Sequence, residues 1–287
     1  MSSDPDALDL GALKAWIGRR ETATDIVTPR LDASLRAVFD RPPGEPAAGD
    51  PATPTIHWCL TPAIARMSEL GEDGHPRRGG FLPPVPLPRR MWAGGELTMT
   101  DPLRVGDTVT RQSRIEAVEA KTGRSGPLCF VTVRHLYSTG RGPAIEERQD
   151  IVYRGESPNG AGAPAAPASV PPGAERQRGF PCDPVLLFRY SALTFNGHRI
   201  HYDLDYAMRQ ESYPGLVVHG PLQAAALIGF AADIHGAVPR TFSFRGVSPL
   251  IAGVSVTLNA ASDADGLRLW ASDVERRVTM QAAARWS

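Results

Sequence analysis

Residues that can transfer protons follow the apolar run 185–194. The segment reads Phe195-Asn196-Gly197-His198-Arg199-Ile200-His201-Tyr202-Asp203. Asn-Gly is a strong turn signal, and turns at the ends of regular elements are where scaffolds place reactive side chains. His201 can take a proton from water near neutral pH, because the ordinary pKa of an imidazole is about 6.5. A short helix is expected to begin at Asp203, so the segment predicts a structured site for acid–base chemistry.

The same segment contains two potential metal ligands. His198 and His201 have a His-x-x-His spacing that could supply two ligands. A zinc ion needs three or four protein ligands, and no nearby cysteine or paired carboxylate completes the set. The sequence therefore predicts no metal.

A buried helix is predicted to begin at Gly220-Pro221. Proline suits the first helical turn, and Gly236 and Pro239 end the helix. The residues between them are apolar on nearly all sides, which predicts enclosure by other elements. N–H groups at a helix N-terminus lack intrahelical partners and carry partial positive charge. Because Pro221 has no N–H, we expect Gly220, with Leu222, to stabilise a negatively charged oxygen.

The remaining chain is predominantly strand-like. Apolar and polar residues alternate between glycine-rich turns, which predicts antiparallel sheets. Strands are expected over 95–99, 108–118, 128–137 and 145–153 in the first half, and over 185–194, 241–244, 254–261, 267–274 and 278–285 in the second. A sheet wrapped on one buried helix is the hot-dog arrangement, of the α+β class.

The chain divides into two similar halves. Residues 156–178 are rich in Ala, Gly and Pro, cannot bury a core and predict a surface linker. The halves share the pattern PLxxGxxVT at 102–110 and 249–257, which indicates a duplicated module. We therefore expect a double hot dog, with an N-terminal lobe over 1–155 that accommodates substrate and a catalytic lobe over 179–287.

The first lobe is expected to lack a counterpart of the buried helix. Residues 68–87 contain too much proline and glycine for a helix. A central helix that is lost or reduced there would leave room for a ligand inside the curled sheet.

The segment 196–201 resembles the hydratase-2 motif of the MaoC-like dehydratases and (R)-specific enoyl-CoA hydratases. Aligned on the last histidine, the family's catalytic Asp falls on Asn196 and its catalytic His on His201. Asn in place of Asp matches one branch, the hydroxyacyl-thioester dehydratase type 2 enzymes, which includes mesaconyl-C4-CoA hydratases. The first half resembles the same branch in Asp73-Gly74-His75-Pro76, GGFLPP at 79–84 and PRRMWAGG at 88–95.

This resemblance implies a hydro-lyase that adds water to, or removes it from, the α,β bond of an acyl thioester. His201 would take the proton, Asn196 would orient the water through its amide oxygen, and the Gly220 N–H would hold the enolate oxygen. Substrate-binding candidates are polar or basic residues near these motifs: His198, Arg199, Arg89, Arg90 and Arg245. The pairs Arg77-Arg78 and Arg89-Arg90 could bind coenzyme A phosphates or a carboxylate on a mesaconyl- or itaconyl-type acyl group.

Composition limits the class of protein. Lys plus Arg and Asp plus Glu are 31 each, which argues against a dedicated nucleic-acid binder. No apolar run approaches the about 20 residues that cross a bilayer. The 3 cysteines are far apart, so we expect reduced, buried thiols and a cytoplasmic protein. Coenzyme A is expected as part of the substrate, with no other cofactor, and pairing of hot-dog lobes permits a homodimer.

Alternatives remain at this point. A dehydratase of carrier-protein-bound 3-hydroxyacyl chains would use the same residues. A non-catalytic acyl-thioester-binding double hot dog would keep the fold without turnover. A thioesterase would normally place a carboxylate or Gln on the central helix, where Gln223 is the sole candidate.

Overall fold

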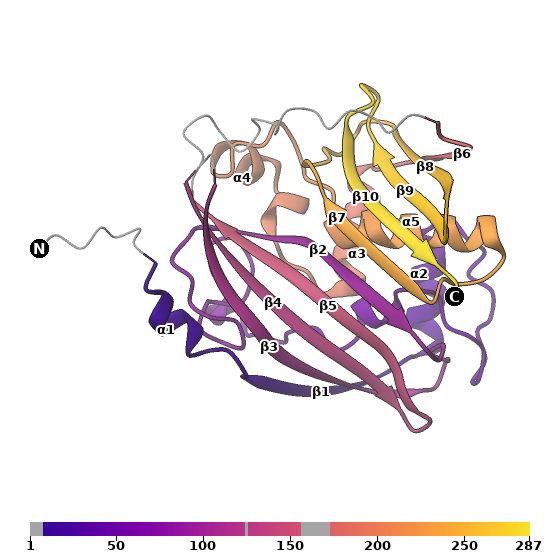
Figure 1. Cartoon of the computed structure of the whole chain (residues 1–287), viewed down its shortest axis with the longest axis horizontal. Coiled ribbons are helices and arrows are strands. Elements are labelled where there is room, and N and C mark those ends of the chain that lie inside the picture. Colours follow the sequence, from indigo (N-terminus) through magenta and orange to yellow (C-terminus); the bar gives the residue numbers. More distant parts are fainter. Residues whose placement is uncertain (1–7, 124–125, 156–172) are drawn as a thin grey trace, which may run out of the picture.

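The computed structural model describes residues 8–123, 126–155 and 173–287, and its strands form one antiparallel sheet. The sheet has ten strands in the order β1-β3-β4-β5-β2-β7-β10-β9-β8-β6 (Figure 1). The first half supplies β1 (Arg20–Ile26), β2 (Arg89–Met99), β3 (Thr108–Gly123), β4 (Gly126–Thr139) and β5 (Gly142–Arg154). The second half supplies β6 (Arg176–Phe180), β7 (Thr241–Gly246), β8 (Val256–Asp263), β9 (Gly266–Ser272) and β10 (Val278–Arg285).

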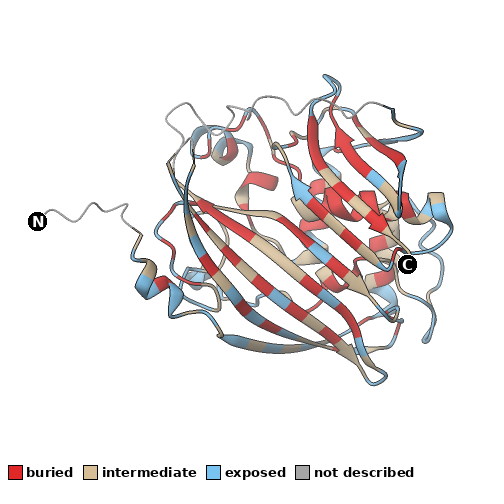
Figure 2. Cartoon of the chain, viewed as in Figure 1, coloured by how far each residue is buried: buried red, intermediate tan, exposed pale blue. Residues whose placement is uncertain are grey.

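The two halves have the same topology. In each half the spatial order is first, third, fourth, fifth and second strand, and the halves meet where β2 pairs with β7. This is the duplicated hot-dog arrangement that the repeated pattern predicted. Buried residues alternate with more exposed ones along much of β3 and β4, as expected for strands with one face towards a core (Figure 2).

Five α-helices lie among the described residues: α1 (Leu10–Lys14), α2 (Pro29–Val38), α3 (Pro184–Thr194), α4 (Leu204–Arg209) and α5 (Gly220–His235). Three short 3₁₀ turns accompany them: η1 (Ile56–Cys59), η2 (Met67–Glu69) and η3 (Arg199–His201). The central helix α5 contacts strands of both halves, including β2, β7 and β10. It ends where Gly236 adopts a left-handed conformation with φ of 86°.

The predicted strand over 185–194 is wrong, because this segment is the helix α3. Its start carries two helix signals: the Asp183 side chain accepts a hydrogen bond from the Leu186 N–H at 2.8 Å, and Pro184 occupies the first turn. A short apolar run does not by itself distinguish a buried strand from a helix. Phe195, with φ of 51°, ends the helix and turns the chain towards Asn196.

The first half lacks a long helix immediately before β2, as predicted. Within 68–87 the chain is irregular apart from the end of η2. The sequence did not predict α2, which begins after the cap Thr28 and buries Leu35 and Val38. Residues 156–172 of the predicted linker lie outside the described residues, and β6 begins inside its last part, at Arg176.

Candidate active site

His201 lies on η3, between α3 and α4, and is held by several local hydrogen bonds. The Asn196 N–H donates to the Ser191 carbonyl at 2.9 Å, which closes the end of α3. The Asp203 side chain accepts from the Tyr206 N–H at 3.0 Å and starts α4, which confirms the predicted short helix. The reactive segment is therefore a tight connection between two helices.

The His201 ring has a defined tautomer. Its Nδ1 lies 2.6 Å from the Val217 carbonyl oxygen, and since a carbonyl only accepts, Nδ1 carries the hydrogen. Nε2 therefore carries no hydrogen and can accept a proton. The His201 ring lines the main cavity. Burial lowers the pKa of His201 to about 4, against the opposing effect of the Val217 hydrogen bond. At neutral pH His201 is a neutral imidazole able to accept a proton.

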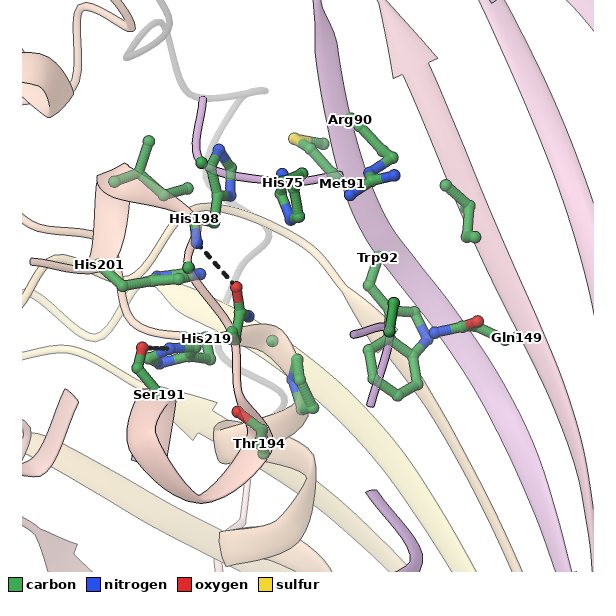
Figure 3. Close-up of a pocket in the computed structure, with 18 of the residues that line it drawn as sticks. His75, Arg90, Met91, Trp92, Gln149, Ser191, Thr194, His198, His201 and His219 are labelled. Atoms are coloured by element: carbon green, nitrogen blue, oxygen red, sulfur yellow. Dashed lines mark hydrogen bonds between the residues drawn. The ribbon is translucent and has the colours of Figure 1, made fainter. Parts of the chain in front are cut away.

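A second histidine supports this ring. His219 stacks on His201 with ring centroids 3.6 Å apart, and its Nε2 lies 2.8 Å from Ser191 Oγ. Burial lowers the pKa of His219 well below its usual range, and the nearby His201 and His198 act in the same direction. His219 is the residue before α5, so the start of this helix positions its ring. The stack fixes the plane of the His201 ring (Figure 3).

Gly220 begins α5 and lines the same cavity. Its N–H has no acceptor in the described parts of the chain. A Cβ at this position would lie 3.5 Å from the Trp92 carbonyl oxygen, so the first turn of α5 approaches β2 closely. A substrate oxygen in the cavity could accept from this N–H at the positive end of the helix.

Asn196 also lines the cavity, and its amide orientation is fixed. Its Oδ1 accepts a hydrogen bond from the His198 N–H at 3.0 Å, and only the oxygen can do so. The expected role of the amide oxygen in orienting water is thereby weakened, since one of its lone pairs is already used. The NH₂ group remains as a donor to water or to a substrate oxygen.

The first half contributes a loop, Asp73-Gly74-His75, to which sequence reasoning assigned no function. Asp73 Oδ2 lies 3.0 Å from His75 Nδ1, and the His75 ring centroid lies 4.2 Å from that of His198 (Figure 3). Burial and the charges of Arg90 and Arg78 lower the pKa of His75, although Asp73 opposes them. The Asp73-Gly74-His75-Pro76 motif marked this loop in the sequence as similar to the family, but it did not indicate what the loop does.

Asp73, His75 and His198 place one potential ligand atom each within 4.8 Å of one another. This geometry could hold a metal ion, although the His75 Nδ1 already interacts with Asp73. The sequence found only the His198–His201 spacing, because the Asp73 loop comes from the other half. The absence of a metal from the reaction stays a prediction.

The main cavity has a volume of about 1050 Å³ and is lined by residues from both halves. The second half provides Asn196, His198, His201, His219 and Gly220. The first half provides Trp92 together with polar side chains of its sheet, including Arg111, His135 and Gln149. The first half, which has no long helix immediately before β2, thus lines the cavity with its sheet, and its role in accommodating substrate stays a prediction.

Three of the four predicted substrate-binding arginines, Arg89, Arg90 and Arg199, line a second cavity, and Arg90 lines the main cavity as well. Arg90 lines the main cavity and has no carboxylate within 4 Å in the described residues. Arg89 is buried against Glu211, with Nε 3.2 Å from Oε2, and Arg199 pairs with Asp203 at 2.7 Å. Both line a second cavity rather than the main one.

Arg245 is a correction. It is exposed and lines neither cavity, because it follows the buried Phe244 on β7 and its side chain is therefore on the opposite face of the sheet. Gln223, the thioesterase candidate, lines the main cavity, but its Oε1 accepts a hydrogen bond from Thr279 Oγ1 at 2.8 Å. The cysteines Cys59, Cys129 and Cys182 are free and buried, as expected.

Comparison with known proteins agrees with this geometry. The family model for hydroxyacyl-thioester dehydratase type 2 matches residues 55–252. The chain is 44% identical over 271 residues to mesaconyl-C(4)-CoA hydratase from Chloroflexus aurantiacus, covering 93% of this chain and 95% of that protein.

Solved structures confirm the fold. HtdX from Mycobacterium tuberculosis superimposes with a TM-score of 0.67 at 20% identity, covering 93% of this chain and 99% of that one. A second protein from that organism, described as having a double hotdog fold, gives a TM-score of 0.53 at 15% identity over 93% and 96% of the two chains. The chain therefore belongs to the hydroxyacyl-thioester dehydratase type 2 family and is a double hot-dog hydratase/dehydratase of acyl thioesters.

Proposed function

We propose that the protein hydrates 2-enoyl-CoA esters reversibly, with His201 as the base and the Gly220 N–H as the oxyanion donor. The observation that carries the proposal is the His201 ring. Its Nδ1 hydrogen is held by Val217 at 2.6 Å, so the unprotonated Nε2 is left for the substrate cavity at the N-terminus of α5.

The reaction follows from these groups. His201 Nε2 takes a proton from water as the water oxygen bonds to Cβ, and the π electrons move to the thioester oxygen. The Gly220 N–H stabilises that enolate oxygen, and Asn196 NH₂ holds an oxygen of water or substrate. Cα then takes the proton from the His201 imidazolium, which restores the base. Dehydration reverses each step.

The acyl group is proposed to carry a carboxylate on or near Cβ, as in a mesaconyl-type ester. Arg90 supports this, because it lies in the cavity near His75 and has no carboxylate partner within 4 Å in the described residues (Figure 3). A carboxylate so close to the reacting carbons would be stabilised by a cation in the reaction cavity. The relative from Chloroflexus aurantiacus is named for a C4 ester of this kind.

A substrate panel with a His201 variant tests the assignment. Enoyl-CoA esters with and without a Cβ carboxylate are supplied to the purified protein, and loss of the conjugated-thioester absorbance is followed. The wild type should hydrate the carboxylated ester with the higher kcat/KM. His201→Ala should reduce kcat by about 10²–10⁴-fold, the usual contribution of a general base.

The matched control is His235→Ala, since His235 is an exposed histidine that stacks on Trp286 and lines neither cavity. It should keep wild-type rates. A folded His201→Ala protein that retains full activity would show that another group is the base. Release of thiol with the double bond intact would instead identify a thioesterase.

The other expectations remain proposals of the same kind. A carrier-protein-bound 3-hydroxyacyl chain is the alternative substrate, and a non-catalytic thioester-binding protein would bind the panel without turnover. No cofactor beyond coenzyme A in the substrate, a cytoplasmic location and a homodimer are proposed from the sequence. In the described residues no helix is long and apolar enough to cross a membrane.

A further inference from the structure

A second cavity lies beside the reaction cavity and is not used by the chemistry above. Its volume is about 1010 Å³. Its walls come from the loop 71–78, the first residues of β2, Arg199 and the α4 region. Six arginines line it, against four carboxylates: Arg77, Arg78, Arg89, Arg90, Arg199 and Arg209 against Glu72, Asp73, Asp205 and Glu211. Such an excess of guanidinium groups favours an anionic ligand.

One of these arginines has a buried donor without an acceptor. Arg89 is 6% exposed, and its Nη1 has no hydrogen-bond partner in the described residues although Nε pairs with Glu211 at 3.2 Å. The donor is closed to a ligand, but a buried cation that is only partly compensated is stabilised when an anion enters the cavity beside it. This is an observation about a single side chain, independent of the charge excess.

The remaining arginines differ in how far they are already engaged. Arg78 donates to the carbonyl oxygens of Val85 and Pro88, and so holds the loop before β2. Arg77 donates to the Leu70 carbonyl through Nε at 3.2 Å, which leaves its two Nη groups for a ligand. Arg77 is therefore the exposed arginine best placed to bind an incoming anion.

The two cavities share part of one wall. His75, Pro76, Arg77, Arg78 and Arg90 line both of them. A ligand with a neutral thioester end and a highly charged end could therefore place one end beside His201 and the other among the arginines.

We propose that the arginine-lined cavity binds the phosphates of coenzyme A, and that this site makes the enzyme prefer CoA esters to carrier-bound ones. The proposal rests on the proposed function. It decides between the two carriers of the acyl group considered there, coenzyme A and a carrier protein. Coenzyme A has a diphosphate and a 3′-phosphate, each able to take two hydrogen bonds from a guanidinium. Phosphopantetheine on a carrier protein has a single phosphodiester, so a cavity with more arginines than carboxylates fits the nucleotide better.

Calorimetric binding of free ligands tests this without depending on turnover. Coenzyme A, 3′-dephospho-coenzyme A, phosphopantetheine and pantetheine are titrated into the wild type, Arg77→Gln and Arg30→Gln. We expect the wild type to bind coenzyme A at least about tenfold more tightly than pantetheine or phosphopantetheine, with the dephospho form between. Arg77→Gln should weaken coenzyme A binding by about 3–10-fold and leave pantetheine binding unchanged.

Arg30→Gln is the matched control, since Arg30 is an exposed arginine of α2 that lines neither cavity. It should bind every ligand as the wild type does. A double variant, Arg77→Gln with Arg209→Gln, tests whether Arg209, which is also exposed, compensates for the loss of Arg77. Equal binding of coenzyme A and pantetheine by the wild type, or of coenzyme A and phosphopantetheine, would overturn the proposal, as would unchanged coenzyme A binding by the double variant.

The outcome is separable from that of the proposed reaction. Binding of coenzyme A through its phosphates without hydration of any ester would support the phosphate site and contradict the proposed activity. Hydration of pantetheine and CoA esters with equal KM would support the activity and contradict the phosphate site. With the site in place, Arg77→Gln should raise KM for the CoA ester alone and change kcat less than about twofold, since a contact with the phosphates is the same in the ground state and the transition state.

Discussion

At the residue scale, the proposed reaction depends on His201, because Asn196 stands where the MaoC-like motif that the segment resembles has a carboxylate. Asn196 cannot accept a proton, and its oxygen already receives the His198 N–H at 3.0 Å. In the proposed reaction the proton acceptor is His201 Nε2, because the hydrogen bond to Val217 places the ring hydrogen on Nδ1. The His219 ring, stacked at 3.6 Å, leaves the imidazole little freedom to rotate.

The pH dependence of hydration should reflect this buried base. Burial lowers the pKa of His201 to about 4, so the neutral, active form persists well below the usual histidine range. We expect kcat/KM to be level from pH 7 to about pH 5 and to fall as the pH approaches 4, because protonation removes the acceptor. Initial rates in overlapping buffers, corrected for enzyme that unfolds, measure it. An acid limb centred near pH 6.5 would contradict the assignment.

At the element scale, two loops from different halves hold the site together. The Arg199 N–H donates to the Asp73 carbonyl at 2.9 Å, and Arg199 Nη1 donates to the Glu72 carbonyl at 3.1 Å. Gly74 has φ of 86°, and a Cβ there would lie 2.0 Å from the Gly197 carbonyl oxygen. Only glycine permits this contact, so the position of His75 beside His198 depends on it.

Gly74→Ala should therefore separate the loops. We expect a loss of about 1–3 kcal/mol in the free energy of unfolding, from strain at positive φ and from the backbone clash, and a kcat/KM at least about tenfold lower. Thermal unfolding and the hydration assay measure the two effects. Gly140→Ala is the control, because a Cβ there meets nothing within 4 Å. Wild-type stability and rate in Gly74→Ala would show that the contact is unimportant.

At the scale of the whole molecule, the first half keeps a polar cluster inside its sheet. His57, Tyr137 and Glu147 are buried together, and Glu147 accepts hydrogen bonds from Trp58 Nε1 at 3.0 Å and from the Tyr137 hydroxyl at 3.1 Å. Burial lowers the pKa of His57 to about 3 and of His135 to about 4, and raises that of Glu147 to about 7. The fold thus favours the neutral form of each group.

Stability should fall in acid for this reason. A histidine whose folded pKa lies below its unfolded value of about 6.5 stabilises the fold fully above pH 6.5, and this is lost as the pH falls towards the folded pKa. His57, His135 and His201 act in this sense, while Glu147 opposes them between about pH 7 and 4.5. Urea unfolding at pH 7, 6 and 5 should show a decrease on the order of 1–3 kcal/mol per pH unit below 6.5.

The variant His135→Gln can keep hydrogen bonds to Ser113 and Gln149, which lie 2.8 and 3.2 Å from the ring nitrogens. It should reduce the acid sensitivity by removing one of the buried imidazoles. Stability that is constant or rises from pH 7 to pH 5 would show that these histidines are not held neutral by the fold.

The sequence by itself determined the features that local patterns encode. Alternating residues gave the long strands β3, β4 and β5, and Gly220-Pro221 with Gly236 gave the ends of α5. The duplication was visible because its two copies keep the same turn residues. The position of His201 followed from its motif, since a turn and a helix cap are decided by a few adjacent residues.

Only the tertiary structure decided which distant residues meet. The run 185–194 is apolar enough for either a strand or a helix, and its packing as α3 depends on elements far along the chain. The Asp73 loop reaches His198 through a glycine contact that no local pattern encodes. Arg245 was expected at the site and faces away, because the face of a strand is set by its register with β2 and β10. Long-range packing, unlike a cap or a turn, is a property of the whole chain.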